Sequence, residues 1–105
     1  MVDVFFAVQT PLGFTVRTTA TYWQLIQRKH PEVIGYEAAI QQGLRQPEEV
    51  RRSTQDPTVH LFYTPILPAY QLVMVAKRLN GEGFLVTCYL SDKKKEGVRI
   101  WPTSA

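Results

Sequence analysis

The stretch from Tyr70 to Ser91 constrains the fold of this chain more than any other. It contains two runs rich in β-branched, apolar and aromatic residues, YQLVMVAKRL and FLVTCYLS, which flank the Gly-containing segment NGEG. Neither run has an internal Gly or Pro, and each is about as long as a typical strand or somewhat longer. This pattern predicts a β-hairpin at the centre of a sheet, and the rest of the chain must cover one of its faces.

The side chains of this hairpin alternate between two faces. An even-numbered loop places an almost purely apolar set on the core face: Val73, Val75, Leu79, Phe84, Val86, Cys88 and Leu90. The opposite face then carries Arg78 beside Thr87 and Tyr89. An odd loop with a bulge would place Lys77 there instead of Arg78, and the sequence leaves both arrangements open.

The length of 105 residues allows one domain, 1–105, with one modest core. The net charge of +3 gives a mild preference for anionic partners. The lone Cys88 excludes an internal disulfide and a cysteine-based zinc site, and it fits a reducing compartment. The early apolar run from Val4 to Val8 is too short for a signal core or a membrane span, so we expect a cytoplasmic protein without membrane contact.

Residues 1–18 predict an N-terminal β-hairpin that covers the sheet or forms its edge, with a turn at Thr10 to Gly13. Residues 19–46 predict two helices, the first from Thr19 to His30 and the second from Gly35 or Tyr36 to Arg45. A threonine caps the first helix, and Pro31 ends it because a residue before proline leaves helical geometry. His30 follows Ile26 by four and Trp23 by seven residues, so it extends their inward-facing stripe.

Residues 47–102 change to a period of two and predict an antiparallel sheet. Strands are expected over Glu49 to Ser53, Thr58 to Thr64 and Val98 to Trp101, with an irregular connection between Pro65 and Pro68. The alternation assigns Val50, Val59, Leu61 and Tyr63 to the core side and Arg51, His60 and Phe62 to the other. The fold class is therefore α+β, with two helices on one face of a four- to five-stranded antiparallel sheet, preceded by the N-terminal hairpin.

Known chemical motifs are scarce. The histidines and carboxylates lack metal-ligand spacing, and the glycines of the hairpin loop do not stand between a strand and a helix, so we expect neither a metal nor a cofactor. No serine stands in a nucleophile-elbow pattern. A basic and hydroxyl-bearing set remains: His30, Arg51, Arg52, Lys77, Arg78, Thr87, Tyr89, Lys93, Lys94 and Lys95.

Metal-independent RNA cleavage requires a set of this kind. The 2′-hydroxyl of the substrate attacks the adjacent phosphate, so the protein supplies a base, an acid and cations rather than a nucleophile. Histidine suits the acid or base role, and arginine binds phosphate through its bidentate fork. Each residue also has a purely structural interpretation: His30 as a helix cap, Arg51 and Arg52 as a solvated strand surface, and the three lysines as a solvated turn.

Several ordered blocks between Trp23 and Trp101 carry a resemblance to a known family. They are W-x-x-I-x-x-x-H-P-E, P-E-E-V-R-R-S, the dipeptide Asp56-Pro57, an aromatic strand ending in Tyr63, V-M-V-A-K-R-L, G-F-L-V-T-C-Y-L-S-D-K-K-K and the terminal Ile100-Trp101. Together these blocks, over about three quarters of the chain, resemble the phage-type branch of the barnase–EndoU–colicin–RelE-like (BECR-fold) nucleases.

This resemblance implies two helices packed on an antiparallel sheet and a metal-independent endoribonuclease activity, often found in toxins or phage-associated proteins. It implies RNA as the substrate and a cognate inhibitor, an antitoxin or immunity protein, as a partner. His30 would be the acid or base, Arg51 or Arg52 would bind phosphate, and Thr87 and Tyr89 would orient or protonate the scissile phosphate. We expect Arg52, Lys77, Arg78, Lys93 and Lys94 to bind RNA, with Lys77 and Arg78 kept as alternatives beside Thr87.

Two other classes of function fit the same residues. The chain could be a non-catalytic module that contacts RNA or a protein through the open face of the sheet. It could also be a structural or regulatory domain that pairs with a second copy through an edge strand. Convergence of His30, an arginine, Thr87 and Tyr89 in one cleft would favour the enzyme over both.

Overall fold

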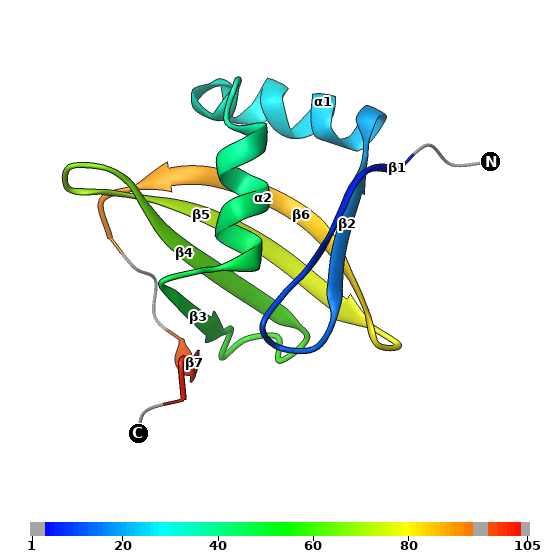
Figure 1. Ribbon diagram of the computed structural model, residues 1–105, viewed down its shortest axis with the longest axis vertical. Coiled ribbons are helices and arrows are strands. Elements are labelled where there is room, and N and C mark those ends of the chain that lie inside the picture. The colour runs from blue at the N-terminus through cyan, green and yellow to red at the C-terminus, as the bar shows by residue number, and fades with distance from the viewer. Residues whose placement is uncertain (1–3, 94–96, 104–105) are drawn as a thin grey trace.

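The computed structural model describes residues 4–93 and 97–103. The elements follow one another as β1 (Val4–Gln9), β2 (Thr15–Thr19), α1 (Ala20–Lys29), the 3-10 turn η1 (Pro31–Val33), α2 (Glu37–Arg45), β3 (Glu49–Arg52), β4 (Val59–Leu67), β5 (Tyr70–Leu79), β6 (Glu82–Ser91) and β7 (Val98–Trp101). The α+β class is confirmed. Figure 1 shows the two helices beside one twisted sheet.

Within the described residues the sheet has seven strands in the order β1-β2-β6-β5-β4-β3-β7, more than the four or five expected. The N-terminal hairpin does not merely precede the sheet but belongs to it. Strand β2 pairs in parallel with β6 through Val16 with Gly83 and Arg17 with Phe84, whereas the other neighbours are antiparallel. The expectation that this hairpin forms an edge is confirmed, because β1 is the outermost strand.

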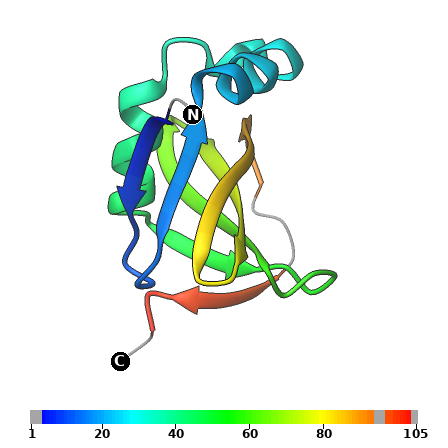
Figure 2. The same ribbon diagram turned by 90° about the vertical axis from the view of Figure 1, so that its right-hand side faces the viewer.

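The helices begin and end close to the predicted residues because local signals fix them. The Thr19 hydroxyl accepts a hydrogen bond from the Tyr22 amide and caps α1. His30 terminates α1, and Pro31 starts η1 directly after it. Helix α2 lies along one face of the sheet, while α1 lies across one end of it (Figures 1 and 2).

Both helices bury residues in one core on the α2 side of the sheet. Trp23 and Ile26 of α1 join Ile40 and Leu44 of α2 in this cluster. The strands contribute Phe6, Val8, Val16, Val50, Phe62, Leu72, Met74, Ala76, Leu85 and Cys88. None of the described helices is long and apolar enough to cross a membrane.

The central hairpin has an even turn and also a bulge, which corrects the predicted faces. Asn80 and Gly81 form the turn with φ values of 53° and 81°, the left-handed backbone that Asn-Gly turns adopt. The register shifts at Val86, since Ala76 pairs with Leu85 whereas Val75 pairs with Thr87. An extra residue in one strand exchanges the faces beyond it.

The strand β5 therefore presents Leu72, Met74 and Ala76 to the helices, and the prediction that Val73 and Val75 do so is wrong. Cys88 does face the core as expected. The assignment for β4 is wrong in the same way, because β4 follows the register of β5: Phe62 pairs with Met74 and lies under the helices. We call the opposite face, which carries Leu61, Tyr63, Val73, Val75 and Tyr89, the open face.

The connection between β4 and β5 is tighter than predicted. Strand β4 continues through Pro65 to Leu67, and Pro65 pairs with Gln71. The register shifts between Pro65 and Leu67, and Ala69 takes a positive φ of 68° in the turn. Proline is tolerated at such an irregularity because the ladder hydrogen bond that it cannot donate is not required there.

Candidate functional site

His30 reaches the open face because α1 lies across the end of the sheet. Its backbone N–H donates to the Ile26 carbonyl and closes the helix, which fixes where the side chain begins. The imidazole packs against the Tyr89 ring with 5.8 Å between ring centroids. Its Nδ1 lies 3.3 Å from Oε2 of Glu32, and one third of the side chain is exposed. A histidine that is accessible, oriented by a carboxylate and packed on a phenol has the surroundings of a proton-transfer group.

Thr87 connects His30 with the floor of the open face. It lines a cavity of about 660 Å³ together with Lys29 and His30. It also lines a cavity of about 470 Å³ together with Tyr89 and residues 53–55. The two cavities therefore adjoin at Thr87, and we call the surface formed by His30, Thr87 and Tyr89 the His30 groove.

Arg51 lies on the same face but farther along the sheet. It pairs with Leu61, which pairs with Val75, which in turn pairs with Thr87. Three strand spacings amount to about 14 Å along the sheet. The Arg51 guanidinium donates to the carboxylate of Glu49, a residue that is 7 % exposed. Arg51 therefore joins the open face as a paired cation at the far side of the groove floor.

Lys77 rather than Arg78 shares the open face with Thr87, as follows from the bulge at Val86. Lys77 pairs with Val59 and Phe84, and its Nζ lies 3.7 Å from Oδ2 of Asp56. The hydrogen bonds that Asp56 accepts from the side chain and backbone of Thr58 lower the pKa of its carboxyl group. Asp56 thus stays ionised opposite Lys77 at ordinary pH.

Arg52 and Arg78 lie on the helix-covered side, away from Thr87. Arg52 pairs with His60, and the Arg78 guanidinium lies 4.7 Å from the centroid of the Phe14 ring. Of the basic run after β6, the Lys93 backbone forms hydrogen bonds with the Ser91 hydroxyl. Lys94 and Lys95, which were expected to bind RNA or to belong to a charged turn, lie outside the described residues.

Three residues that sequence reasoning did not assign to the site also line it or support it. Tyr22 is 40 % exposed, and its hydroxyl donates to the Val86 carbonyl at 2.9 Å. Lys29 adds a cation beside His30. Glu32 could have been identified, because it follows His30 by two residues across the proline that ends α1.

Cys88 is poorly placed to act as a nucleophile, and the described residues hold no metal-ligand cluster. Burial raises the pKa of the Cys88 thiol to about 12, and the Glu32 carboxylate adds to the rise, so the thiolate nucleophile is scarce at neutral pH. Among residues 4–93 and 97–103, no group of three or more His, Cys, Asp or Glu side chains could hold a metal ion. The groove offers proton-transfer groups, hydroxyls and cations.

Comparison with protein-family models, with curated proteins and with solved structures gave no match to this chain. The groove itself and the sequence blocks between Trp23 and Trp101 are therefore the features that bear on function.

Proposed function

We propose that this protein is a metal-independent endoribonuclease that cleaves RNA by attack of the substrate 2′-hydroxyl on the adjacent phosphate. One observation carries the proposal: the His30 imidazole packs on Tyr89 beside Thr87, in a groove on the open face of the sheet. The three residues come from the end of α1 and from β6, so the fold unites an ionisable ring, a phenol and a hydroxyl from segments far apart in sequence.

The proposed reaction needs one proton removed and one proton supplied. As the 2′-oxygen bonds to phosphorus, its proton passes to a base; as the bond from phosphorus to the 5′-oxygen breaks, an acid protonates the leaving oxygen. His30 serves one of these steps, and the Glu32 carboxylate at 3.3 Å orients its ring. Tyr89, whose ring packs on the imidazole, orients or protonates the scissile phosphate.

Charge on the pentacoordinate phosphorus is offset by donors along the same face. Thr87 lies between the two cavities, where its hydroxyl can donate to a phosphate oxygen. Lys29 and Lys77 supply positive charge on either side of it. Arg51 lies three strands from Thr87 and is bound to Glu49, so its phosphate role is at a neighbouring phosphate of the RNA rather than at the scissile one. Arg52 and Arg78, on the helix-covered side, are left to bind more distant RNA.

The blocks that resemble the BECR-fold nucleases support the same function. They extend the proposal to a toxin or phage-associated effector that acts on RNA in the cytoplasm and is held in check by a cognate inhibitor protein. The resemblance and the position on the open face support the same four candidate residues: His30, Arg51, Thr87 and Tyr89.

The test is incubation of the purified full-length chain with a broad panel of RNAs in EDTA. We expect internal cleavage that leaves 2′,3′-cyclic phosphate and 5′-hydroxyl ends, and no cleavage of DNA of the same sequence, because DNA lacks the 2′-hydroxyl. Intact RNA after incubation with folded protein would count against the proposal. Products with 3′-hydroxyl ends would exclude the proposed attack by the 2′-oxygen.

A second function, binding of RNA without cleavage, is favoured by the pairing of Arg51 with Glu49. A carboxylate that already occupies the guanidinium makes it a weaker stabiliser of a developing phosphorane than a vacant one. Binding that weakens steeply with salt, together with intact RNA, would identify such a module, because each phosphate contact releases counterions.

A further inference from the structure

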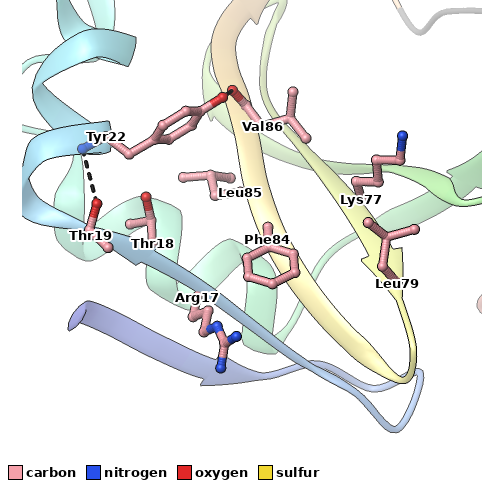
Figure 3. Close-up of a pocket in the computed structure, with 9 residues that line it drawn as sticks. All are labelled: Arg17, Thr18, Thr19, Tyr22, Lys77, Leu79, Phe84, Leu85 and Val86. Atoms are coloured by element: carbon pink, nitrogen blue, oxygen red, sulfur yellow. Dashed lines mark hydrogen bonds between the residues drawn. The ribbon is translucent and has the colours of Figure 1, made fainter. Parts of the chain in front are cut away.

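A crevice opens beside the His30 groove where β2 leaves β6 (Figure 3). The parallel pairing of these strands ends at Arg17 and Phe84, after which the chain turns into α1. The Tyr22 hydroxyl bridges the gap by donating to the Val86 carbonyl. The crevice between them has a volume of about 320 Å³. That volume is at the lower end of the range of about 300 to 1,000 Å³ for small-molecule sites, so it suits a single heterocycle.

Phe84 gives this crevice an aromatic wall with cations on both sides. The Phe84 side chain is partly exposed, and the Arg17 guanidinium lies over one face of its ring, 4.7 Å from the centroid, so a base would stack on the other face. Arg17 is held there by Glu82, whose Oε1 is 2.8 Å from Arg17 Nη1. Lys77, the β5 partner of Phe84, also lines the crevice. Aromatic faces beside basic groups are what single-stranded nucleic acids bind, because the bases stack while the phosphates pair.

Thr18 adds an independent sign that a polar ligand belongs in the crevice. The residue is 5 % exposed, and its hydroxyl oxygen is buried with no hydrogen-bond partner among the described residues. Thr18 lines the crevice, and Figure 3 draws its oxygen on the side toward Tyr22. A buried hydroxyl without a partner is costly, and the cost is relieved when a ligand supplies a donor or acceptor. The edge of a nucleobase offers both.

The crevice adjoins the His30 groove, with the hydrogen bond from Tyr22 to Val86 between them. Tyr22 and Val86 line both the crevice and the cavity that contains His30 and Thr87. Because of the bulge at Val86, Phe84 and Thr87 pair with Lys77 and Val75, which are two residues, or about 7 Å, apart along β5. An RNA chain whose phosphate lies at Thr87 can therefore place a neighbouring base against Phe84.

We propose that this crevice is a subsite for an unpaired RNA base, which stacks on Phe84 and bonds to Thr18 while Arg17 and Lys77 face its phosphates. The subsite rests on the proposed function in that the flanking phosphate is the one cleaved. It makes the protein selective for single-stranded RNA, because a base in a duplex cannot leave its stack without cost.

The experiment measures binding with a probe that cannot be cleaved. Fluorescein-labelled single-stranded oligonucleotides with 2′-fluoro sugars are titrated with the full-length protein by fluorescence anisotropy. Phe84→Leu, which keeps apolar volume but removes the ring, is expected to weaken binding roughly tenfold. Tyr70→Leu, a matched change of a partly exposed aromatic residue at the other end of the sheet, is expected to change binding less than about twofold.

Thr18→Val tests the hydrogen bond separately. We expect roughly threefold weaker binding, because valine fills the same space without the hydroxyl. Among 2′-fluoro oligonucleotides made of a single base, A, C, G or U, the order of affinity should also change. Since the Thr18 hydroxyl has no hydrogen-bond partner among the described residues, the melting temperature should stay equal or rise. The subsite would be overturned if Phe84→Leu bound the oligonucleotides as tightly as wild type. It would also be overturned if wild type bound an oligonucleotide with abasic sites as tightly as one with all its bases.

Cleavage of unmodified RNA, measured in parallel, separates the two proposals. If wild type and Phe84→Leu cleave and bind equally, the subsite is wrong and the ribonuclease stands. If binding depends on Phe84 but RNA stays intact, the subsite stands and the ribonuclease is wrong. If the wild type does not bind the 2′-fluoro oligonucleotides at all, the subsite is wrong whatever the cleavage assay gives.

Discussion

The two histidines of the chain lie on opposite faces of one sheet, and their surroundings differ. The His30 side chain is one third exposed, packs on Tyr89 and faces the Glu32 carboxylate. His60 is 7 % exposed and packs against the Phe14 ring with 5.4 Å between centroids. Burial lowers the pKa of His60, and the cations of Arg78 and Arg52 lower it further. The His30 side chain is accessible to a substrate, whereas burial favours the neutral form of His60.

The same contrast extends to the faces themselves. The helix-covered face holds the main core, including Phe62 and Met74, which are fully buried. The open face has a smaller apolar cluster of Leu61, Tyr63 and Val73, surrounded by the groups proposed to handle RNA. Substitutions on the first face should therefore change stability, and substitutions in the His30 groove should change activity.

The largest expected effect belongs to His30. His30→Ala should lower the rate of RNA cleavage about 10²- to 10⁴-fold, because a positioned general acid or base contributes a factor of this size. The melting temperature should change little, since a third of the side chain is exposed and its contact with Glu32 lies at the surface. Initial cleavage rates and thermal unfolding are measured on the same preparations.

The control for this prediction lies on the other face. His60→Gln should retain cleavage per folded molecule, since His60 lies under Phe14 and away from the His30 groove. If His30→Ala unfolds the protein, or if it cleaves as fast as wild type, the assignment of His30 as the proton carrier fails.

The packing of the two faces can be compared with one Val→Ala substitution on each face. Val50 is fully buried in the main core, whereas Val75 is only partly buried on the open face. Val50→Ala should lower the free energy of unfolding by about 2 to 3 kcal/mol, and Val75→Ala by less than about 1 kcal/mol. Urea unfolding measures both. Equal losses would mean that the open face is packed as tightly as the covered one.

The helices could be predicted from sequence because their limits are local. The Thr19 hydroxyl caps α1 by accepting a hydrogen bond from the amide of Tyr22, only three residues later. Pro31 ends the same helix regardless of its surroundings. The convergence of Thr87 and Tyr89 was also predictable, since both lie on the same side of the bulge at Val86 and alternation keeps them on one face.

The faces of β4 and β5 could not be predicted, for a physical reason. A sheet with apolar side chains on both faces gives no alternation that marks the covered one, and Val73 and Leu72 are both fully buried on opposite faces. The bulge at Val86 then exchanges the two faces between the turn and Thr87, so that Lys77 rather than Arg78 lies on the face of Thr87. The strand number was missed because the pairing of β2 with β6 joins residues that are distant in sequence.

The smallest expected effect is the pH dependence of stability that His60 contributes. Its pKa is lowered in the folded protein, chiefly by burial, although a hydrogen bond to the Thr58 backbone opposes the shift. A histidine in an unfolded chain has a pKa of about 6.5. Below that pH the unfolded chain therefore binds a proton that the folded chain does not bind. The stability contribution is therefore complete above about pH 6.5 and is lost as the pH falls toward the lowered pKa of the folded state.

This contribution can be isolated from other titrating groups by comparing variants. Wild type should lose unfolding free energy between about pH 7.5 and pH 5 in urea titrations, and His60→Gln should lose less over the same interval, because glutamine cannot take up the proton. His30→Gln, the same change at a histidine that is one third exposed, serves as the control for the substitution itself. The slope, rather than the stability at one pH, is decisive, because glutamine changes the packing against Phe14 equally at both pH values. Identical slopes for wild type and His60→Gln would mean that His60 accepts its proton in the folded state, and the contrast between the two histidines would then lose its electrostatic part.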